Sequence, residues 1–169
     1  QRGTPLLPLQ WGGGQEQGLR PGTLPVPLII GLAAAAKLAL ADRSERQDRL
    51  SVLRDRLWSA LKVRHPQIRL NGAQQPRLAH NLNITVPDVS GSRLHRTLKS
   101  RLACSSGSAC SRGEPSHVLK AIGRSRAEAE ASLRLSLGRD TTPAEIEVAI
   151  DVISAAIEGM TSGETRVNP

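Results

Sequence analysis

Aromatic side chains are nearly absent from this chain, and their absence constrains its fold more than any other feature. The 169 residues include two tryptophans but no phenylalanine or tyrosine. Any hydrophobic core must therefore be built from Leu, Ile, Val and Ala. Hydrophobic residues make up 38% of the chain and charged residues 22%, a balance typical of a folded domain rather than of a disordered segment. The length is sufficient for one domain of ordinary size.

Apolar residues recur at helical spacing in several segments. Pro27 suits the first turn of a helix, Pro66 ends one, and Thr142 with Glu145 has the spacing of a capping box. Residues from about Thr161 lack periodicity and are expected to form a frayed tail. A helix is also predicted to carry Leu94, Leu98 and Leu102 on a single stripe. The other predicted helices cover residues 27–42, 44–65, 115–123 and 142–160, the last of them with a buried face of Ile146, Ala149, Ile150, Ile153 and Ile157.

Strand-like alternation appears in three places between these helices. Ile68–Leu70 is short, whereas residues 82–86 and 133–137 place an apolar side chain at every second position. Helices that alternate with a few short strands predict an α+β fold, in which a small, mainly antiparallel sheet is covered by helices on one side.

A formal net charge of +8 raises the question of nucleic-acid binding. The basic residues are scattered over predicted helix faces, as at Arg46, Arg49 and Arg54, and few aromatic side chains are available to stack on bases. This pattern favours solvated helix faces or an acidic protein partner over direct contact with nucleic acid.

Two cysteines and no signal peptide indicate a reducing compartment, so we expect a cytoplasmic protein without a disulfide framework. The longest apolar run, Leu24–Ala41, is rich in alanine and is interrupted by Pro25, Pro27 and Lys37. It is too weakly hydrophobic for a good membrane span.

Cys110 lies in a run of Ser and Gly that is unsuited to rigid structure, in the stretch ACSSGSACSRGEPSHVL. A buried structural role does not suit such surroundings, and a zinc site is disfavoured because neither cysteine has a partner at CxxC spacing. No metal site is therefore predicted. Cys104 follows the apolar pair Leu102 and Ala103 and is expected to be a packed residue at a strand end. Ser116 and His117 are expected to be structural residues of a first helical turn.

Three segments in this order resemble the group I (NifS/IscS-like) cysteine desulfurases of the aminotransferase class-V family. They are SGSAC at Ser106–Cys110, EPSxVL at Glu114–Leu119 and RxSLG at Arg134–Gly138. The resemblance implies that the chain is the C-terminal part of a fold-type I pyridoxal 5'-phosphate (PLP) enzyme. Residues 1–26 would then end the large PLP domain, residues 27–160 would form the small domain with an active-cysteine loop at 104–114, and residues 161–169 would form the tail.

A fourth segment supports the resemblance. Residues 12–23, GGGQEQGLRPGT, resemble a family loop that reaches the active site of the neighbouring subunit, which implies a homodimer. Glycine-rich backbone and hydroxyl groups suit an anion, although such a loop taken alone is more often a flexible connection between elements. By resemblance, Thr23 and Arg20 are the candidate PLP-phosphate residues.

Arg134 alternates with leucines on a predicted strand, so its side chain should leave the core and face the opposite side. A guanidinium there can bind a carboxylate with two parallel hydrogen bonds, and a surface salt bridge is the alternative. The resemblance implies that Arg134 binds the α-carboxylate of the amino-acid substrate.

The implied reaction converts L-cysteine to L-alanine. PLP serves as an electron sink, the Cys110 thiolate attacks the substrate sulfur, and a persulfide remains on Cys110 for transfer to an iron–sulfur scaffold or a sulfur-relay protein. The link between Cys110 and Glu114 is about two residues shorter than in long-loop relatives, which reduces its reach by at most ~3.6 Å per residue. The alternatives are another PLP-dependent C–S lyase and a non-catalytic sulfur-carrier or interaction domain.

The lysine that attaches PLP is expected to lie outside this chain. Lys37, Lys62, Lys99 and Lys120 do not stand in a matching motif.

Overall fold

The computed structural model describes residues 3–105 and 115–164, with side chains placed up to Thr161. These residues divide into two compact units between Arg43 and Ser44, and each unit is described by itself. The domain boundaries expected from the sequence, after residues 26 and 160, remain a prediction.

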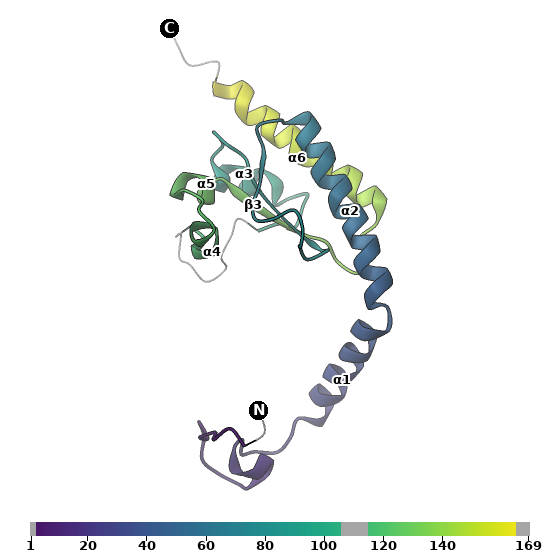
Figure 1. The fold of residues 1–169 in the computed structure, drawn as a ribbon, viewed down its shortest axis with the longest axis vertical. Coiled ribbons are helices and arrows are strands. Elements are labelled where there is room, and N and C mark those ends of the chain that lie inside the picture. The colour runs from purple at the N-terminus through teal and green to yellow at the C-terminus, as the bar shows by residue number, and fades with distance from the viewer. Residues whose placement is uncertain (1–2, 106–114, 165–169) are drawn as a thin grey trace. The chain divides into compact units, whose positions relative to one another are not determined.

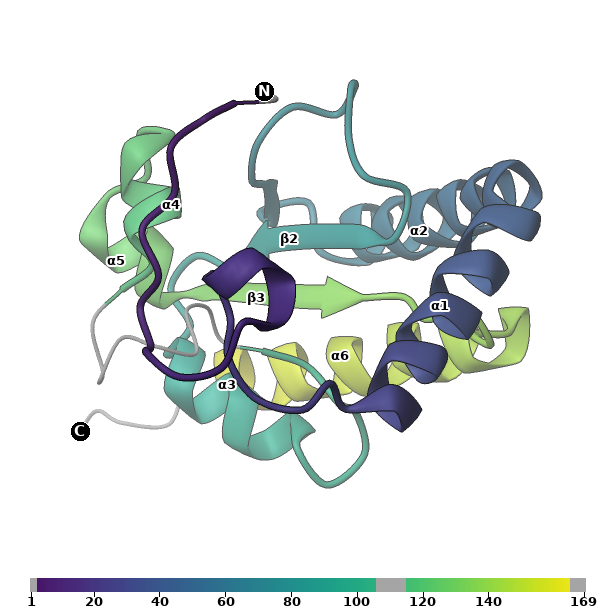
Figure 2. The same ribbon diagram turned by 90° about the horizontal axis from the view of Figure 1, so that it is seen from below.

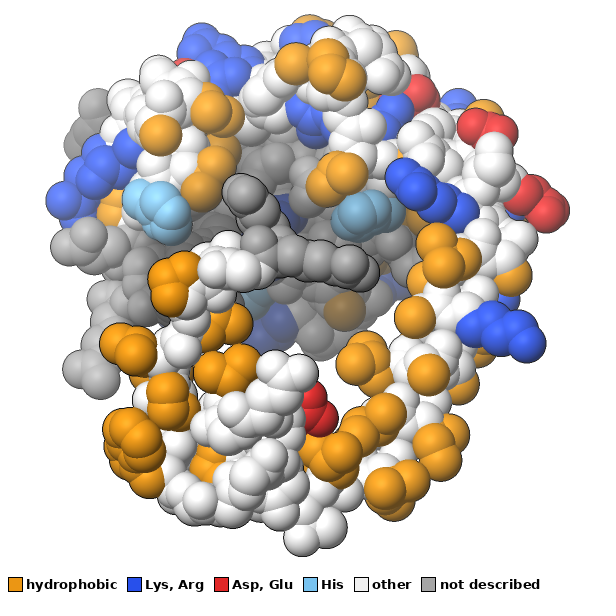
Figure 3. Space-filling view, turned by 60° about the horizontal axis from the view of Figure 1, so that its bottom comes forward, with side chains coloured by type: hydrophobic (Ala, Val, Ile, Leu, Met, Phe, Trp, Pro, Cys, Tyr) orange, Lys and Arg blue, Asp and Glu red, His pale blue; other side chains and the backbone are white. Residues whose placement is uncertain are grey.

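The first unit contains a short 3-10 turn, η1 (Gln15–Gly18), and helix α1 (Val26–Ala41). The predicted helix over residues 27–42 is thus confirmed, with Pro27 in its first turn. No residue of α1 is buried, and the space-filling view shows hydrophobic side chains along this part of the surface (Figure 3). Leu28, Ile30 and Leu32 are each more than 60% exposed. Helices that are apolar on all sides are usually buried in a larger protein.

The second unit is built on a three-stranded antiparallel sheet (Figure 1). Strand β1 (Arg69–Leu70) pairs with β2 (Asn81–Thr85), which pairs with β3 (Ser132–Ser136), so the order is β1-β2-β3. Figure 2 shows β2 and β3 running side by side above α6 and α3. The α+β architecture predicted from the sequence is confirmed.

Helices α2 (Arg43–Arg64), α3 (Gly91–Leu98) and α6 (Pro143–Glu164) pack on the same core as the inward face of the sheet. The core is aliphatic, as the composition requires, and Leu61, Ile84, Leu98, Ile150 and Ile153 have no exposed surface. The face of α6 that the sequence predicted is buried throughout. None of the helices in the described ranges is both long and apolar enough to cross a bilayer.

Two short helices, α4 (His117–Ala121) and α5 (Arg126–Glu130), precede β3. Helix α4 begins later than predicted, because Ser116 is its N-cap and accepts a hydrogen bond from the Leu119 amide. Helix α5 was not predicted, although Ser125 and Glu128 form a capping box with both reciprocal hydrogen bonds.

Two further sequence-based boundaries are wrong. Helix α3 ends at Leu98 rather than near Leu102, which lies beyond the helix but still packs against the core. Helix α6 continues through Thr161 to Glu164, where a frayed tail was expected. The capping box at its start is confirmed: the Glu145 amide donates to Thr142, and the Thr142 amide donates to Glu145. The Thr142 amide and hydroxyl both donate to the Glu145 carboxylate, and these two hydrogen bonds lower the pKa of Glu145.

Candidate active site

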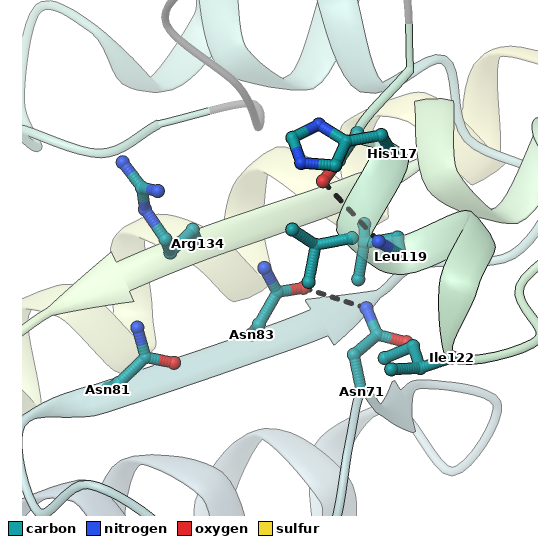
Figure 4. Close-up of a pocket in the computed structure, with 9 residues that line it drawn as sticks. Asn71, Asn81, Asn83, His117, Leu119, Ile122 and Arg134 are labelled. Atoms are coloured by element: carbon teal, nitrogen blue, oxygen red, sulfur yellow. Dashed lines mark hydrogen bonds between the residues drawn. The ribbon is translucent and has the colours of Figure 1, made fainter.

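A pocket of about 350 Å³ lies on the face of the sheet opposite the core (Figure 4). Arg134 of β3 and three asparagines form its polar side, and α4 supplies an apolar wall. The nine lining residues include an arginine but neither aspartate nor glutamate, so the pocket favours an anion. They are Asn71, Asn81, Asn83, Ser116, His117, Val118, Leu119, Ile122 and Arg134.

Strand alternation places Arg134 in this pocket. Its neighbours Leu133 and Leu135 are buried in the core, whereas Arg134 is exposed on the other face. The prediction that its side chain leaves the core is therefore confirmed. A planar guanidinium with five N–H donors matches a carboxylate with two parallel hydrogen bonds.

The segment that contains Cys110 begins and ends beside this pocket. The amide of Ser105 donates to the carbonyl oxygen of Arg134 (3.1 Å), and the amide of Arg134 donates to that of Ser105 (2.8 Å). On the other side, Pro115 is buried and is followed by Ser116, which lines the pocket. Cys110 itself, with most of the predicted loop at 104–114, lies outside the described residues.

Cys104 is partly buried and packs against the core, as the sequence predicted. Burial raises the pKa of its thiol. The Nε2 atom of His95 donates to the carbonyl oxygen of Cys104 (3.0 Å), which ties α3 to the start of the predicted loop. A thiol that resists ionisation is a poor nucleophile, so Cys104 is suited to structure rather than to attack.

The glycine-rich loop is closed by its own hydrogen bonds. The Gly22 amide donates to Oε1 of Gln15 (3.1 Å), and the Arg20 guanidinium donates to the carbonyl oxygens of Pro21 (3.2 Å) and Gly22 (3.5 Å). Thr23 follows the loop, is exposed, and has no hydrogen-bond partner for its hydroxyl among residues 3–105 and 115–164. The Thr23 hydroxyl is therefore open to a phosphate, whereas Nη1 of Arg20 already donates to two carbonyl oxygens.

Arg20 and Thr23 belong to the first compact unit, and Arg134 belongs to the second. The structure thus brings Arg134 together with both ends of the Cys110 segment, but describes the glycine-rich loop separately.

Sequence reasoning missed the asparagines beside Arg134. Asn81 and Asn83 alternate with Leu82 and Ile84, so the pattern that placed Arg134 on the outer face of β3 could have placed them on the outer face of β2. Asn71 follows β1 in a loop and carried no comparable signal.

A buried polar network lies under the pocket. Asn71, Thr85 and Ser132 are at most 4% exposed, and their side chains are joined by hydrogen bonds of 2.9–3.1 Å. Arg124 donates from Nε to Oδ1 of Asn71 and from Nη2 to the carbonyl oxygen of Leu70, each at 2.7 Å. The amide of Arg124 donates to the carbonyl oxygen of Leu119 in α4, so the network fixes the apolar wall of the pocket to the sheet.

Other polar groups have structural roles. Nζ of Lys62 donates to the carbonyl oxygens of Pro66 and Ile68 after the end of α2, so it secures the turn into β1. Within the described ranges there is no cluster of three or more His, Cys, Asp or Glu residues that could hold a metal ion.

The profile of the aminotransferase class-V family matches residues 10–148, which include the glycine-rich loop, the Cys110 segment and Arg134. The chain belongs to the aminotransferase class-V family. It is 41% identical over 155 residues to the cysteine desulfurase IscS of Rickettsia akari (strain Hartford), a match that covers 90% of this chain and 38% of the relative.

Solved structures of a NifS-like protein and of SspA have a similar fold. A NifS-like protein superposes with a TM-score of 0.82 at 31% identity, covering 93% of this chain and 40% of that protein. A structure described as SspA in complex with cysteine superposes with a TM-score of 0.55 at 33% identity, covering 83% and 38%. The class-V chain therefore spans well under half the length of each of these proteins.

Proposed function

We propose that this chain forms the part of a PLP-dependent cysteine desulfurase that binds the substrate carboxylate and carries the sulfur-accepting cysteine. The observation that carries the proposal is the position of Arg134, which lines an anion-accepting pocket and is hydrogen-bonded through its backbone to the start of the Cys110 segment. The similarity to IscS-type and NifS-like proteins supports the same activity.

L-Cysteine is the proposed substrate. Its α-carboxylate binds the Arg134 guanidinium, while Leu119 and Ile122 close the apolar side of the pocket. The similarity to a protein solved in complex with cysteine supports this choice. Two charge-assisted hydrogen bonds orient the substrate and also increase its affinity.

Cys110 is the proposed nucleophile. It lies five residues after Ser105 and five before Pro115, both of which are anchored beside the pocket. A five-residue tether spans at most about 18 Å, which is sufficient for a thiol to reach a pocket-bound substrate and then the protein surface. The short link Ser111-Arg112-Gly113 limits the outward reach, not the identity of the attacking group.

The reaction transfers one sulfur atom. The Cys110 thiolate attacks Sγ of the bound cysteine, a bond forms between the two sulfurs, and the substrate Cβ–S bond breaks with its electron pair passing to the substrate carbon. Protonation of that carbon yields L-alanine, and Cys110 retains the persulfide. When bound, PLP supplies the electron sink that stabilises negative charge on the substrate.

The remaining roles follow from the class-V resemblance. Thr23, and with it Arg20, contributes to the phosphate site of PLP in the neighbouring subunit of a homodimer, and the lysine that attaches PLP lies outside this chain. The glycine-rich loop belongs to the end of the large domain, and residues 27–160 form the small domain. The persulfide sulfur passes in the cytoplasm to an iron–sulfur scaffold or a sulfur-relay protein.

The test uses the complete enzyme, in which this chain is joined to a PLP-binding large domain, supplied with L-cysteine labelled at sulfur. Cys110→Ser should release no alanine and carry no labelled persulfide. Cys104→Ser is the matched control, because Cys104 is packed and its thiol pKa is raised. This variant should retain most of the activity, with the label on Cys110. Label on Cys104 after turnover, or full turnover by Cys110→Ser, would refute the assignment.

A further inference from the structure

Asn83 stands directly opposite Arg134 in the sheet. The two residues are partners in the antiparallel register of β2 and β3, and both line the pocket. Side chains of directly paired residues lie on the same face, with Cβ atoms about 4.5–5.5 Å apart. Figure 4 shows both side chains on the pocket side of the sheet.

Hydrogen bonds determine which end of the Asn83 amide faces the pocket. Arg124 can only donate, so the Asn71 atom that accepts from its Nε must be Oδ1. Nδ2 of Asn71 is then the donor to Oδ1 of Asn83, at 2.7 Å. Asn83 is therefore left with Nδ2 and its two N–H groups on the side away from Asn71.

The Nδ2 group of Asn83 has no hydrogen-bond partner in the part of the chain that the structure describes. Figure 4 shows this nitrogen directed toward the space beside Arg134. Its orientation does not depend on an exposed, freely rotating amide, because Asn71 is 4% exposed and is bonded to Arg124, Thr85 and Ser132. The donor is thus held in place before any ligand binds.

We propose that Asn83 is a second carboxylate-binding residue, whose Nδ2 donates a hydrogen bond to the α-carboxylate of the amino-acid substrate held by Arg134. The inference rests on the proposed carboxylate role of Arg134. A carboxylate has two oxygens with about four acceptor sites, so it can accept both from the guanidinium and from a neighbouring amide. Asn71 acts through Asn83 and is a positioning residue.

The experiment measures ligand binding to the complete holoenzyme in a Cys110→Ser background, which prevents turnover. L-Cysteine is compared with cysteamine, which has the same amine and thiol but lacks the carboxylate. Asn83→Ala should weaken L-cysteine binding by about tenfold to a hundredfold, the effect of one hydrogen bond to a charged group, and should leave cysteamine binding unchanged. Arg134→Ala should act on L-cysteine in the same selective way.

Asn83→Asp is a second variant, used because Asn83→Ala also removes the hydrogen bond with Asn71 and could disturb the fold. It keeps the oxygen that accepts from Asn71 but replaces the donor with a second acceptor, so it should weaken L-cysteine binding at least as much as Asn83→Ala. The inference is supported if the Asn83 variants bind L-cysteine more weakly while their affinity for cysteamine is unchanged. Unchanged L-cysteine affinity in Asn83→Asp, or equal weakening of both ligands, overturns it.

The comparison with Arg134→Ala separates the two proposals. If Arg134→Ala is selective and the Asn83 variants are not, only the role of Asn83 fails. If Arg134→Ala has no effect on L-cysteine binding, the proposed carboxylate site itself fails, and the inference fails with it.

Discussion

Gly91→Ala provides a direct test of the packing between α3 and α5. Gly91 is the first residue of α3 and is buried. A Cβ at this position would overlap the carbonyl oxygen of Glu130 and would lie 2.9 Å from the carbonyl carbon of Glu130 and 3.2 Å from Cα of Ala131. All three are backbone atoms, so no side-chain rotation can relieve the contact.

Two effects of the substitution oppose one another. Alanine has the higher helix propensity, which would stabilise a helix by up to about 1 kcal/mol. Overpacking of a well-packed site costs about 1–3 kcal/mol, and a fixed backbone neighbour places the cost toward the upper end. We expect a net loss of about 2 kcal/mol in the free energy of unfolding. At a urea m-value of about 1–3 kcal/mol/M, the midpoint falls by about 1 M.

Urea unfolding followed by the fluorescence of Trp58 measures this effect, since Trp58 packs against the core of the second unit. Trp11 is 87% exposed and can be replaced by Leu to leave a single reporter. Gly159→Ala is the matched control, because Gly159 lies in α6 with no atom within 4 Å of a new Cβ. That variant should be unchanged or slightly more stable. A Gly91→Ala protein as stable as Gly159→Ala would refute the reasoning.

Three further predictions concern ionisable groups and the cofactor. Burial lowers the pKa of His65, partly offset by Glu158, so its folded pKa lies below its unfolded value. The free energy of unfolding should therefore fall as the pH drops below about 6.5. In urea titrations at pH 7 and pH 5, His65→Leu should lose less stability between the two pH values than the unchanged protein does. An equal loss in both proteins would exclude His65 as the cause of the decline. The raised pKa of Cys104 predicts that iodoacetamide at pH 8 modifies Cys104 more slowly than Cys110, as peptide mass spectrometry would show; equal rates would contradict the burial argument. The chain alone, mixed with PLP, should retain no visible absorbance after gel filtration, because the lysine that attaches PLP is proposed to lie outside this chain. A stoichiometric adduct of PLP with this chain would overturn that proposal.

Local patterns in the sequence predicted most of the second unit. The helix of residues 44–65, the alternation in β2 and β3, and the capping box at Thr142 each depend on neighbours a few positions away. Such interactions are visible in a single sequence. The helix boundary was predicted wrongly where an apolar residue continues the helical spacing but packs on the core from outside the helix. Leu102 is one example, because it is apolar and packed although it lies outside a helix.

The candidate site was predictable only in part. Arg134 was found because strand alternation and a family motif coincide at one residue. Asn83 obeys the same alternation but stands outside the quoted motifs, and the direction of its amide depends on Asn71 and Arg124, which are 53 positions apart in the chain. A sequence carries no local trace of such a hydrogen bond.

The sequence by itself therefore determined the aliphatic core, the α+β class, the outward position of Arg134 and the family. Only the tertiary structure decided that Arg134 faces a pocket bordered by both ends of the Cys110 segment, that Asn83 presents its N–H groups beside the guanidinium, and that a Cβ at residue 91 would overlap the backbone of Glu130. The physical reason is the same in each case. Periodicity and capping are interactions between near neighbours, whereas a pocket, an amide orientation and a steric limit arise where distant segments meet.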